Sequence, residues 1–294
     1  MTARARLTII LALSSIPVFA GAAEERVTFS VDGLTVVGTL NLPNGVDNPP
    51  AILLLHGFTG SRDKLEIPAV GEGIYKRAAR AWAEQGIASL RIDYRNSGES
   101  DGDFADSTMN AHVADGLAAL DWLAQNRTVD ASRLALVGWS IGGAVGAAVA
   151  ARTSHSLNAV ALWAPGTNMA SAIALMFGVE RFKQGLASGG EPVKVTLPWG
   201  AEIALKSGFF ESLYAIDPVA EITRYTGPLL VAVGTKDDVV FPHPISGQIL
   251  LDYHTGEEEL FVRDMDHVFN AFAGVEQVDE LIEATAVFVG KNLR

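Results

Sequence analysis

The stretch VGWSIGG, residues 137–143, places a serine between glycines directly after an apolar run. Glycines two residues before and two residues after Ser140 leave room for a tight turn, in which a helix starts close to the end of a strand. The hydroxyl would then lie at a helix N-terminus, where free N–H groups and the helix dipole favour developing negative charge. The pattern predicts a strand, a strained turn that presents Ser140, and a helix over residues 141–152.

From residue 50 onward, short apolar runs alternate with helical patterns. In most of the runs the apolar residues are not interrupted by polar ones, as they would be in a strand with one solvent-exposed face. The runs therefore fit strands that are covered on both faces. The runs span residues 51–55, 88–92, 134–137, 159–163 and 229–233, and helical spacing is found over residues 71–86, 109–126 and 141–152. A last strand at 258–262 and a helix at 275–289 complete the series. The sequence predicts an α/β fold with a mainly parallel central sheet flanked by helices.

The N-terminal residues have the pattern of an export signal. Arg4 and Arg6 precede an apolar segment over residues 7–19, and the small residues Ala20-Gly21-Ala22 follow it. A membrane anchor is the alternative, but this apolar segment is shorter than the roughly 20 residues of a membrane-spanning helix. We expect cleavage near residue 22, export to the periplasm or the outside, and no stable membrane span after cleavage. Residues 26–30 and 34–42 then predict a β-hairpin around Val31-Asp32-Gly33.

The composition narrows the class of protein. With 294 residues, 49% of them apolar and 19% charged, the chain can bury a large core. The absence of cysteine excludes disulfides, a thiol nucleophile and a cysteine-ligated metal. The net charge of −12 becomes more negative once the signal arginines are removed, so we expect no nucleic-acid partner.

One long segment interrupts the alternation of strands and helices. Residues 165–218 separate two strands by far more than a βα connection needs, and they form the predicted insertion between a first core part (23–164) and a second (219–294). Two interpretations remain open: a cap over a substrate pocket, or an insertion that covers its own small core. The cap is favoured because ligands bind beyond the carboxyl ends of the strands in open α/β folds. Within the insertion, a hairpin is predicted around Pro198-Trp199-Gly200-Ala201, and the candidate substrate contacts are Met169, Phe177, Trp199 and Phe209.

Candidates for a base and an acid follow two later strands. A serine hydroxyl is a poor nucleophile by itself, so it needs a histidine base, and the histidine needs an acid that orients it. The strand at 229–233 ends in GTKDDVV (residues 234–240), and the strand at 258–262 is followed by DMDH (residues 264–267). These candidates therefore lie on the sheet edge that carries Ser140. Upstream, HGF (residues 56–58) follows another strand, and its Phe58 N–H can join the Ile141 N–H in an oxyanion hole.

These motifs, in this order, resemble a serine α/β-hydrolase over about residues 27–291. Within that superfamily, the chain is similar to bacterial cinnamoyl and feruloyl esterases and to prolyl oligopeptidase-like hydrolases. The motifs that carry the resemblance are HGF (56–58), DYR (93–95), SGES (97–100), GWSIG (138–142), GTKD (234–237) and DH (266–267). One departure is Asn96-Ser97, where many relatives have Gly-His.

The resemblance implies a role for each matching residue. Ser140 would be the nucleophile, Asp237 the acid and His267 the base, while the N–H groups of Phe58 and Ile141 would bind the oxyanion. The insertion would be a lid that shapes the acyl or aryl pocket. No cofactor and no metal are implied, and the four histidines outside these motifs have no metal-ligand spacing.

Several neighbouring residues compete for these roles. Asp238 adjoins Asp237, but the spacing from Gly234 favours Asp237, and Asp266 is interpreted as local structure. His56 is expected to brace its loop through hydrogen bonds. The remaining histidines, His112, His155, His243 and His254, are expected at the surface, and Arg95 is expected to pair with Glu99.

The leading functional hypothesis is a carboxylic ester hydrolase that needs no cofactor and acts on small or aryl esters, including cinnamoyl-type esters. A serine peptidase or amidase is the second hypothesis, because related peptidases use the same three residues. A binding protein that retains the fold is the third. The presence of Ser, Asp and His at all three expected positions argues against the third hypothesis. A comparison of the hydrolysis rates of esters and anilides distinguishes the first two.

Overall fold

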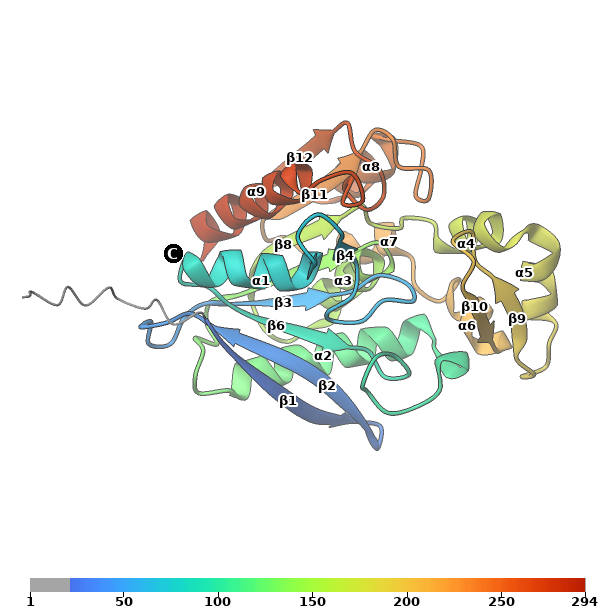
Figure 1. Cartoon of the computed structure of the whole chain (residues 1–294), viewed down its shortest axis with the longest axis horizontal. Coiled ribbons are helices and arrows are strands. Elements are labelled where there is room, and N and C mark those ends of the chain that lie inside the picture. The colour runs from blue at the N-terminus through green and yellow to red at the C-terminus, as the bar shows by residue number, and fades with distance from the viewer. Residues whose placement is uncertain (1–21, 294) are drawn as a thin grey trace, which may run out of the picture.

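The computed structural model describes residues 22–293, so the cleavage signal expected at residues 1–22 lies almost wholly outside the described part. The core is an eight-stranded sheet with the order β1-β2-β6-β3-β7-β8-β11-β12 (Figure 1). From β6 to β12 the neighbouring strands are parallel, while β1 and β2 join as antiparallel strands at one edge. The strands are β1 (Ala23–Val31), β2 (Leu34–Leu42), β3 (Ala51–Leu55), β6 (Ala88–Asp93), β7 (Leu134–Trp139), β8 (Leu157–Trp163), β11 (Leu229–Gly234) and β12 (Glu258–Arg263). The predicted α/β-hydrolase architecture is confirmed.

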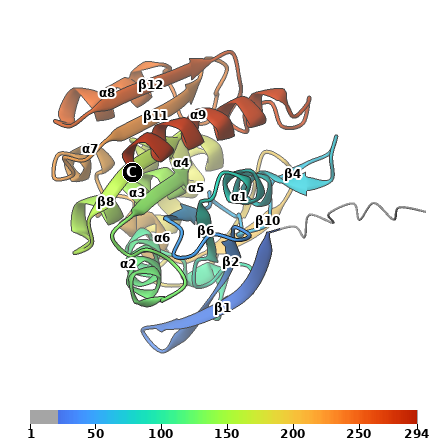
Figure 2. The ribbon, with the colours of Figure 1, turned by 90° about the vertical axis from the view of Figure 1, so that its left-hand side faces the viewer.

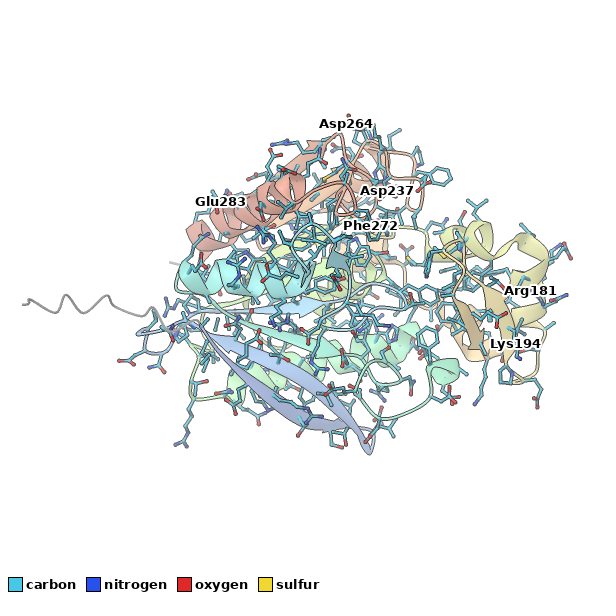
Figure 3. All side chains as sticks on the ribbon, in the orientation of Figure 1. Arg181, Lys194, Asp237, Asp264, Phe272 and Glu283 are labelled. Atoms are coloured by element: carbon cyan, nitrogen blue, oxygen red, sulfur yellow. The ribbon has the colours of Figure 1, made fainter. Side chains whose placement is uncertain are left out.

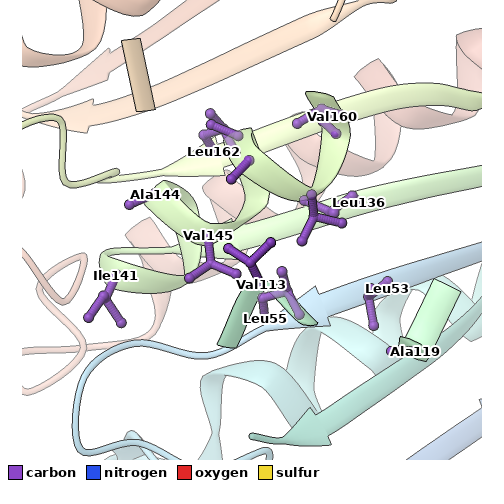
Figure 4. Packing of buried hydrophobic residues seen from close by; sticks show 14 of the residues in the cluster. Leu53, Leu55, Val113, Ala119, Leu136, Ile141, Ala144, Val145, Val160 and Leu162 are labelled. Atoms are coloured by element: carbon purple, nitrogen blue, oxygen red, sulfur yellow. The ribbon is translucent and has the colours of Figure 1, made fainter. Parts of the chain in front are cut away.

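Helices cover both faces of the sheet, because successive strand residues point to opposite sides. In β3, Leu53 and Leu55 belong to one buried cluster, and Ile52 and Leu54 belong to the other. The first cluster lies under α2 (Met109–Gln125), α3 (Ile141–Arg152) and α8 (Ile245–Tyr253), and Figure 4 shows part of it. The second lies under α1 (Ile74–Glu84) and α9 (Glu276–Asn292), which run close together in Figures 1 and 2. This double cover explains the continuous apolar runs of the central strands.

The predicted hairpin at the N-terminal edge is confirmed. β1 and β2 pair up to Val31 opposite Leu34, so Asp32 and Gly33 form a two-residue turn. Both turn residues have positive φ, 50° and 83°, as the favoured hairpin turn requires. The turn residue Asp32 also accepts a hydrogen bond from Arg95, at 2.6 Å.

The insertion lies beyond the carboxyl ends of the strands, at the right of Figure 1. Its predicted hairpin is confirmed, since Val193 pairs with Leu205 at the open end. The insertion is also tied to the core: the backbone N–H of Lys206 donates to the Ala105 carbonyl at 3.0 Å, and that of Met109 donates to Ser212 Oγ at 2.9 Å. The inserted elements are α4 (Met169–Phe177), α5 (Val179–Leu186), β9 (Val193–Thr196), β10 (Glu202–Leu205) and α6 (Ser207–Ser212), and α7 (Pro218–Ile222) leads back to the core.

Smaller elements surround the carboxyl edge of the sheet. A two-stranded ribbon of β4 (Glu66–Ile67) and β5 (Glu72–Gly73) precedes α1, and a 3₁₀ turn, η1 (Phe104–Asp106), precedes α2. Within residues 22–293, no helix has the length and the apolar character that crossing a bilayer requires.

The expected pair between Arg95 and Glu99 is wrong. Arg95 turns inward, where its Nε lies 2.7 Å from Oδ1 of Asp115, a fully buried carboxylate on α2. Glu99 remains exposed and pairs with Arg26 and Arg62, each at 3.0 Å. The burial of Asp115 explains the difference, because an unpaired buried carboxylate would be costly.

Candidate active site

Ser140 lies on the turn between β7 and α3, in a backbone conformation that few residues other than glycine adopt. Its φ is 58° and its ψ is −118°. A Cβ atom on Gly138 would overlap the carbonyl oxygen of Gly142, and one on Gly142 would overlap that of Leu55. The turn is held by hydrogen bonds, among them one from the Ser140 N–H to the Trp163 carbonyl at 2.9 Å. The glycine spacing therefore presents the serine at the carboxyl edge of the sheet, as the sequence predicts.

The structure brings Ser140, His267 and Asp237 into one hydrogen-bonded chain. Nε2 of His267 lies 2.9 Å from Oγ of Ser140, and Nδ1 of His267 lies 2.7 Å from Oδ2 of Asp237. Trp139, directly before the serine, donates its indole N–H to the His267 carbonyl at 3.0 Å, and its ring centroid lies 5.2 Å from that of His267. Sequence reasoning gave Trp139 no role, although this contact ties the histidine loop to the serine turn.

Asp237 is held as a carboxylate by several donors. Its side chain is 0% exposed, and its Oδ1 accepts the backbone N–H groups of Val239 and Val240 at 2.8 and 3.0 Å. Burial by itself raises the pKa of this carboxyl, but interactions with His243, His267 and the Val240 N–H outweigh it and hold the pKa well below its usual value. Asp237 is therefore ionised at neutral pH and can orient His267.

The competing carboxylates lie elsewhere. Asp238 is exposed and lines the cavity beside the serine, and Asp237 is the residue in contact with His267. Asp266 accepts the N–H groups of Val268 and Asn270 at 3.0 and 2.7 Å, so it shapes its own turn. Both arrangements agree with the sequence interpretation.

The loop after β3 brings a second backbone N–H group to the site. Phe58 follows β3, Ile141 begins α3, and β3 and β7 are neighbouring parallel strands. Among residues 22–293, neither the Phe58 N–H nor the Ile141 N–H donates a hydrogen bond to another protein group. His56 braces the loop, as expected: its Nδ1 lies 2.8 Å from the Gly57 carbonyl, and burial lowers its pKa to about 4, so it is neutral at pH 7.

A cavity of about 730 Å³ opens in front of Ser140 and His267. Its walls come from the core loops and from the insertion. Figure 3 labels Asp237 and Phe272, which come from the loops after β11 and β12. The main apolar lining residues are Phe58, Leu65, Phe104, Trp139, Met176, Trp199, Ile203, Val239, Val268 and Phe272.

The four predicted substrate contacts divide into two groups. Trp199, at the tip of the β9–β10 hairpin, lines the cavity and is 58% exposed. Phe209 and Phe177 lie behind the wall, with ring centroids 5.4 and 6.0 Å from that of Phe58. Met169 is buried in the core against Gly166. The prediction is thus wrong for these three as wall residues, because packing between the insertion and the core turns them away from the cavity.

In the described part of the chain, no group of three or more His, Cys, Asp or Glu side chains has the geometry to hold a metal ion. The arrangement built by the chain's own residues is a serine with a base, an oriented acid and two free N–H groups beside a mostly apolar cavity. This set of groups can attack a carbonyl carbon and stabilise the resulting oxyanion.

The family model described as X-Pro dipeptidyl-peptidase (S15 family) matches residues 32–197, more than half of the chain. The chain belongs to the S15 family. The S15 match includes Phe58, Ser140 and Ile141, and it ends before Asp237 and His267. Since this family consists of serine hydrolases with the α/β-hydrolase fold, the resemblance inferred from the sequence is confirmed.

Other comparisons find relatives over part of the chain and a solved structure with the same fold. An uncharacterized 31.7 kDa protein of the traX-finO intergenic region of Escherichia coli is 33% identical over 105 residues, which is 36% of this chain and 34% of that protein. The thiohydrolase aneE of Aspergillus aculeatus is 34% identical over 122 residues, 40% of this chain and 35% of that protein. The matched part thus spans about a third of the length of these curated relatives. The structure of Est1E from Butyrivibrio proteoclasticus with bound ferulic acid superposes with a TM-score of 0.70 at 20% identity, over 91% of this chain and 99% of Est1E.

The surface assignment of the remaining histidines in this S15 protein is mostly wrong. His112 and His254 are buried, and burial lowers the pKa of His112 to about 3. The ring of His243 is 2% exposed, and its Nε2 lies 3.4 Å from Oδ2 of Asp237. Only His155 among the four keeps substantial exposure. An isolated histidine in a sequence does not indicate whether its side chain is buried. The contact between His243 and Asp237 could therefore not be predicted from the sequence.

Proposed function

We propose that this protein is an exported serine carboxylic ester hydrolase that acts through an acyl-enzyme on small or aryl esters. The observation that carries the proposal is the hydrogen-bonded chain from Ser140 through His267 to the buried Asp237, open to a largely apolar cavity. His267 Nε2 lies at the serine hydroxyl, where it can remove the proton as the oxygen attacks. Its Nδ1 proton faces Asp237, which stabilises the charge that His267 then acquires.

The remaining steps follow from the same geometry. The tetrahedral intermediate carries a negative oxygen, which the N–H groups of Phe58 and Ile141 are free to bind. His267 gives its proton to the departing alcohol, and the acyl group stays on Ser140 Oγ. Water then attacks the acyl carbon as His267 takes a proton from it. His267 returns this proton to Ser140 Oγ as the bond to the acyl carbon breaks, and the acid is released as the second product.

The cavity supports an acyl group of moderate size with an aromatic or aliphatic body. Its volume lies within the range of small-molecule sites, and its lining is mostly apolar and aromatic. The related fold of Est1E holds ferulic acid, which supports cinnamoyl-type esters among the candidates. In this proposal the insertion is a cap, because Met176, Trp199 and Ile203 form part of the cavity wall.

A peptidase acting on the amino end of a peptide is the second candidate. The S15 family description names X-Pro dipeptidyl-peptidase, and the exposed carboxylate of Asp238 faces the cavity, where a free amino group would need a negative partner. Lys64 also lines the cavity and would oppose a positively charged ligand. Ester hydrolysis remains the leading proposal because it needs no such anchor.

The decisive experiment compares initial rates for a short-chain aryl ester, a methyl cinnamate-type ester and an X-Pro anilide. Ser140→Ala is measured beside Ser156→Ala, which changes an exposed serine on the turn before β8. We expect ester turnover in the wild type and in Ser156→Ala, and none in Ser140→Ala. Rapid quenching followed by mass spectrometry should find the acyl group on the peptide that contains Ser140. Activity in Ser140→Ala would refute the mechanism, and preference for the anilide would favour the peptidase.

Export is tested separately from chemistry. Expression of the full chain in a bacterium with a secretion system should deliver protein whose sequence starts near residue 23. Replacing Ala20 and Ala22 with bulky residues should block this processing. Full-length protein that stays in the cytoplasm would contradict the export proposal and leave the ester hydrolase proposal intact.

A further inference from the structure

Two imidazole rings approach the same oxygen of Asp237. Nδ1 of His267 lies 2.7 Å from Oδ2 of Asp237. His243, on the loop that leads into α8, places its Nε2 3.4 Å from the same Oδ2. The ring of His243 is 2% exposed and the Asp237 side chain is 0% exposed, so bulk solvent screens their interaction little. The three-residue chain described above therefore has a fourth polar neighbour.

A hydrogen bond on the far side of the His243 ring bears on which of its two nitrogens carries the proton. Nδ1 lies 2.7 Å from Oγ of Ser246, which is itself buried. When the serine hydroxyl donates to Nδ1, the ring proton lies on Nε2 and faces the carboxylate. The other tautomer would direct a lone pair at a negative oxygen. Within the described residues this buried Nε2 makes no hydrogen bond of normal geometry, and its contact with Oδ2 of Asp237 is the 3.4 Å approach between the two side chains.

We propose that His243 is a positioning residue that acts through Asp237 and sets the basicity of His267. This proposal rests on the proposed function only where it concerns turnover. The Nε2–H of His243 takes part of the negative charge on Oδ2, and less of that charge remains to stabilise the protonated form of His267. His243 thereby keeps His267 more readily deprotonated, which is the form that can accept the serine proton.

The carboxylate does not depend on His243 for its position. Oδ1 is anchored by the N–H groups of Val239 and Val240, so loss of His243 leaves Asp237 facing His267. The other charged groups of this loop, Lys236 and Asp238, are exposed, and Lys236 pairs with Asp264 at 2.9 Å. His267 comes from the loop after β12, where Asp266 accepts N–H groups of its own turn. Removal of His243 is therefore expected to change the charge at Oδ2 rather than the geometry of the site.

The test compares His243→Leu, which keeps an apolar body without a donor, with His243→Gln, which restores an N–H group at a similar reach. His155→Gln, at a half-exposed histidine that contacts Asp121, is the matched control. The first readout needs no substrate: the His267 ring is titrated by NMR and assigned by its loss in His267→Gln. The second readout is the pH dependence of kcat/KM for the best ester.

In His243→Leu, the NMR titration midpoint of His267 and the acidic limb of the pH profile should both move to higher pH, by about 0.5 to 1 unit, or roughly 3- to 10-fold in proton affinity. His243→Gln should reverse most of the shift, and His155→Gln should match the wild type. Ser246→Ala, which frees the tautomer, should give a smaller shift in the same direction and serves if the leucine variant does not fold.

An unchanged or lower midpoint in both His243→Leu and Ser246→Ala would overturn the proposal, even if kcat fell, because a packing role alone lowers activity without raising the midpoint. If the wild type hydrolysed no ester, the NMR arm would still decide the role of His243. Failure of the proposed function and failure of this inference are thus distinguishable.

Discussion

The replacement of Asp237 by asparagine is the sharpest test of the site. The buried carboxylate is hydrogen-bonded to the N–H groups of Val239 and Val240 and to Nδ1 of His267, and Nε2 of His243 lies 3.4 Å from its Oδ2. Asparagine has one acceptor oxygen and one NH₂ group. If the oxygen keeps the two backbone N–H groups, the NH₂ faces His267 and can donate only to an unprotonated Nδ1. The proton of His267 then moves to Nε2, where it blocks acceptance of the serine proton.

The expected loss follows from that tautomer. An imidazole with the wrong tautomer cannot act as the general base, and the same change of acid to amide in the triad of serine proteases lowers kcat by about 10⁴. This corresponds to about 5.5 kcal/mol of transition-state stabilisation, at about 1.4 kcal/mol for each factor of ten. KM should change little, because Asp237 does not line the cavity.

The assay measures kcat and KM on an aryl ester for Asp237→Asn and Asp238→Asn, with thermal unfolding as a check on folding. Asp238→Asn should lose less than tenfold, since its exposed side chain makes no contact with His267. A folded Asp237→Asn enzyme that keeps more than a tenth of the wild-type kcat would refute the reasoning. Equal losses in the two variants would show that the acid has been assigned to the wrong residue.

Three further predictions concern the walls and the buried histidines. Trp199→Ala should lower kcat/KM for aryl esters about tenfold relative to acetyl esters, and it should cost little stability because the ring is exposed at the cavity rim. Equal losses for both esters would contradict a cap that selects the acyl group. Phe209→Leu removes the ring stacked on Phe58 and should weaken binding of a boronic acid transition-state analogue more than it raises KM; equal changes would mean that the ring does not support the oxyanion loop. Burial lowers the pKa of His112 in the folded protein to about 3, below its ordinary value of about 6.5. Below pH 6.5 the unfolded chain therefore binds a proton that the folded protein does not, and the free energy of unfolding falls as the pH is lowered toward 3. Between pH 6.5 and 4.5 the loss of stability is about 2 kcal/mol. Urea unfolding of His112→Phe should show a correspondingly shallower decline, whereas parallel declines would contradict the assignment.

The parts of the fold that follow from local patterns could be predicted from the sequence. Continuous apolar runs identify the parallel strands, and the glycine spacing around Ser140 identifies the turn, because each pattern reflects a constraint within a few residues. The strand ends then place Asp237 and His267 on the same edge. By contrast, α8 was missed: it begins after Pro244 without a side-chain cap, and its sequence ISGQILLDY includes glycine and serine.

Contacts between distant segments could not be predicted in the same way. Which side of a short helix faces the cavity depends on how the insertion packs on the core, and this turned Phe209 toward Phe58 while Met176 reached the cavity wall. The inward turn of Arg95 required a buried carboxylate on α2, which the spacing of charges near Arg95 does not reveal. The same holds for His243, whose partner lies six residues away around a loop.

The attachment of the insertion determines how ligands can enter and leave. A hinged movement of the whole segment would break the hydrogen bonds from Lys206 to Ala105 and from Met109 to Ser212, and would pull Phe209 off Phe58. Entry of substrate and exit of product through a fixed opening is the simpler route. The exposed aromatic rings of Trp199 and Phe272 lie at the rim of this opening. Substrate entry then depends on the cross-section of the molecule rather than on a conformational change of the insertion. The rate of product release would fall as the acid becomes larger, and it would not depend on a solvent-damped movement of the insertion.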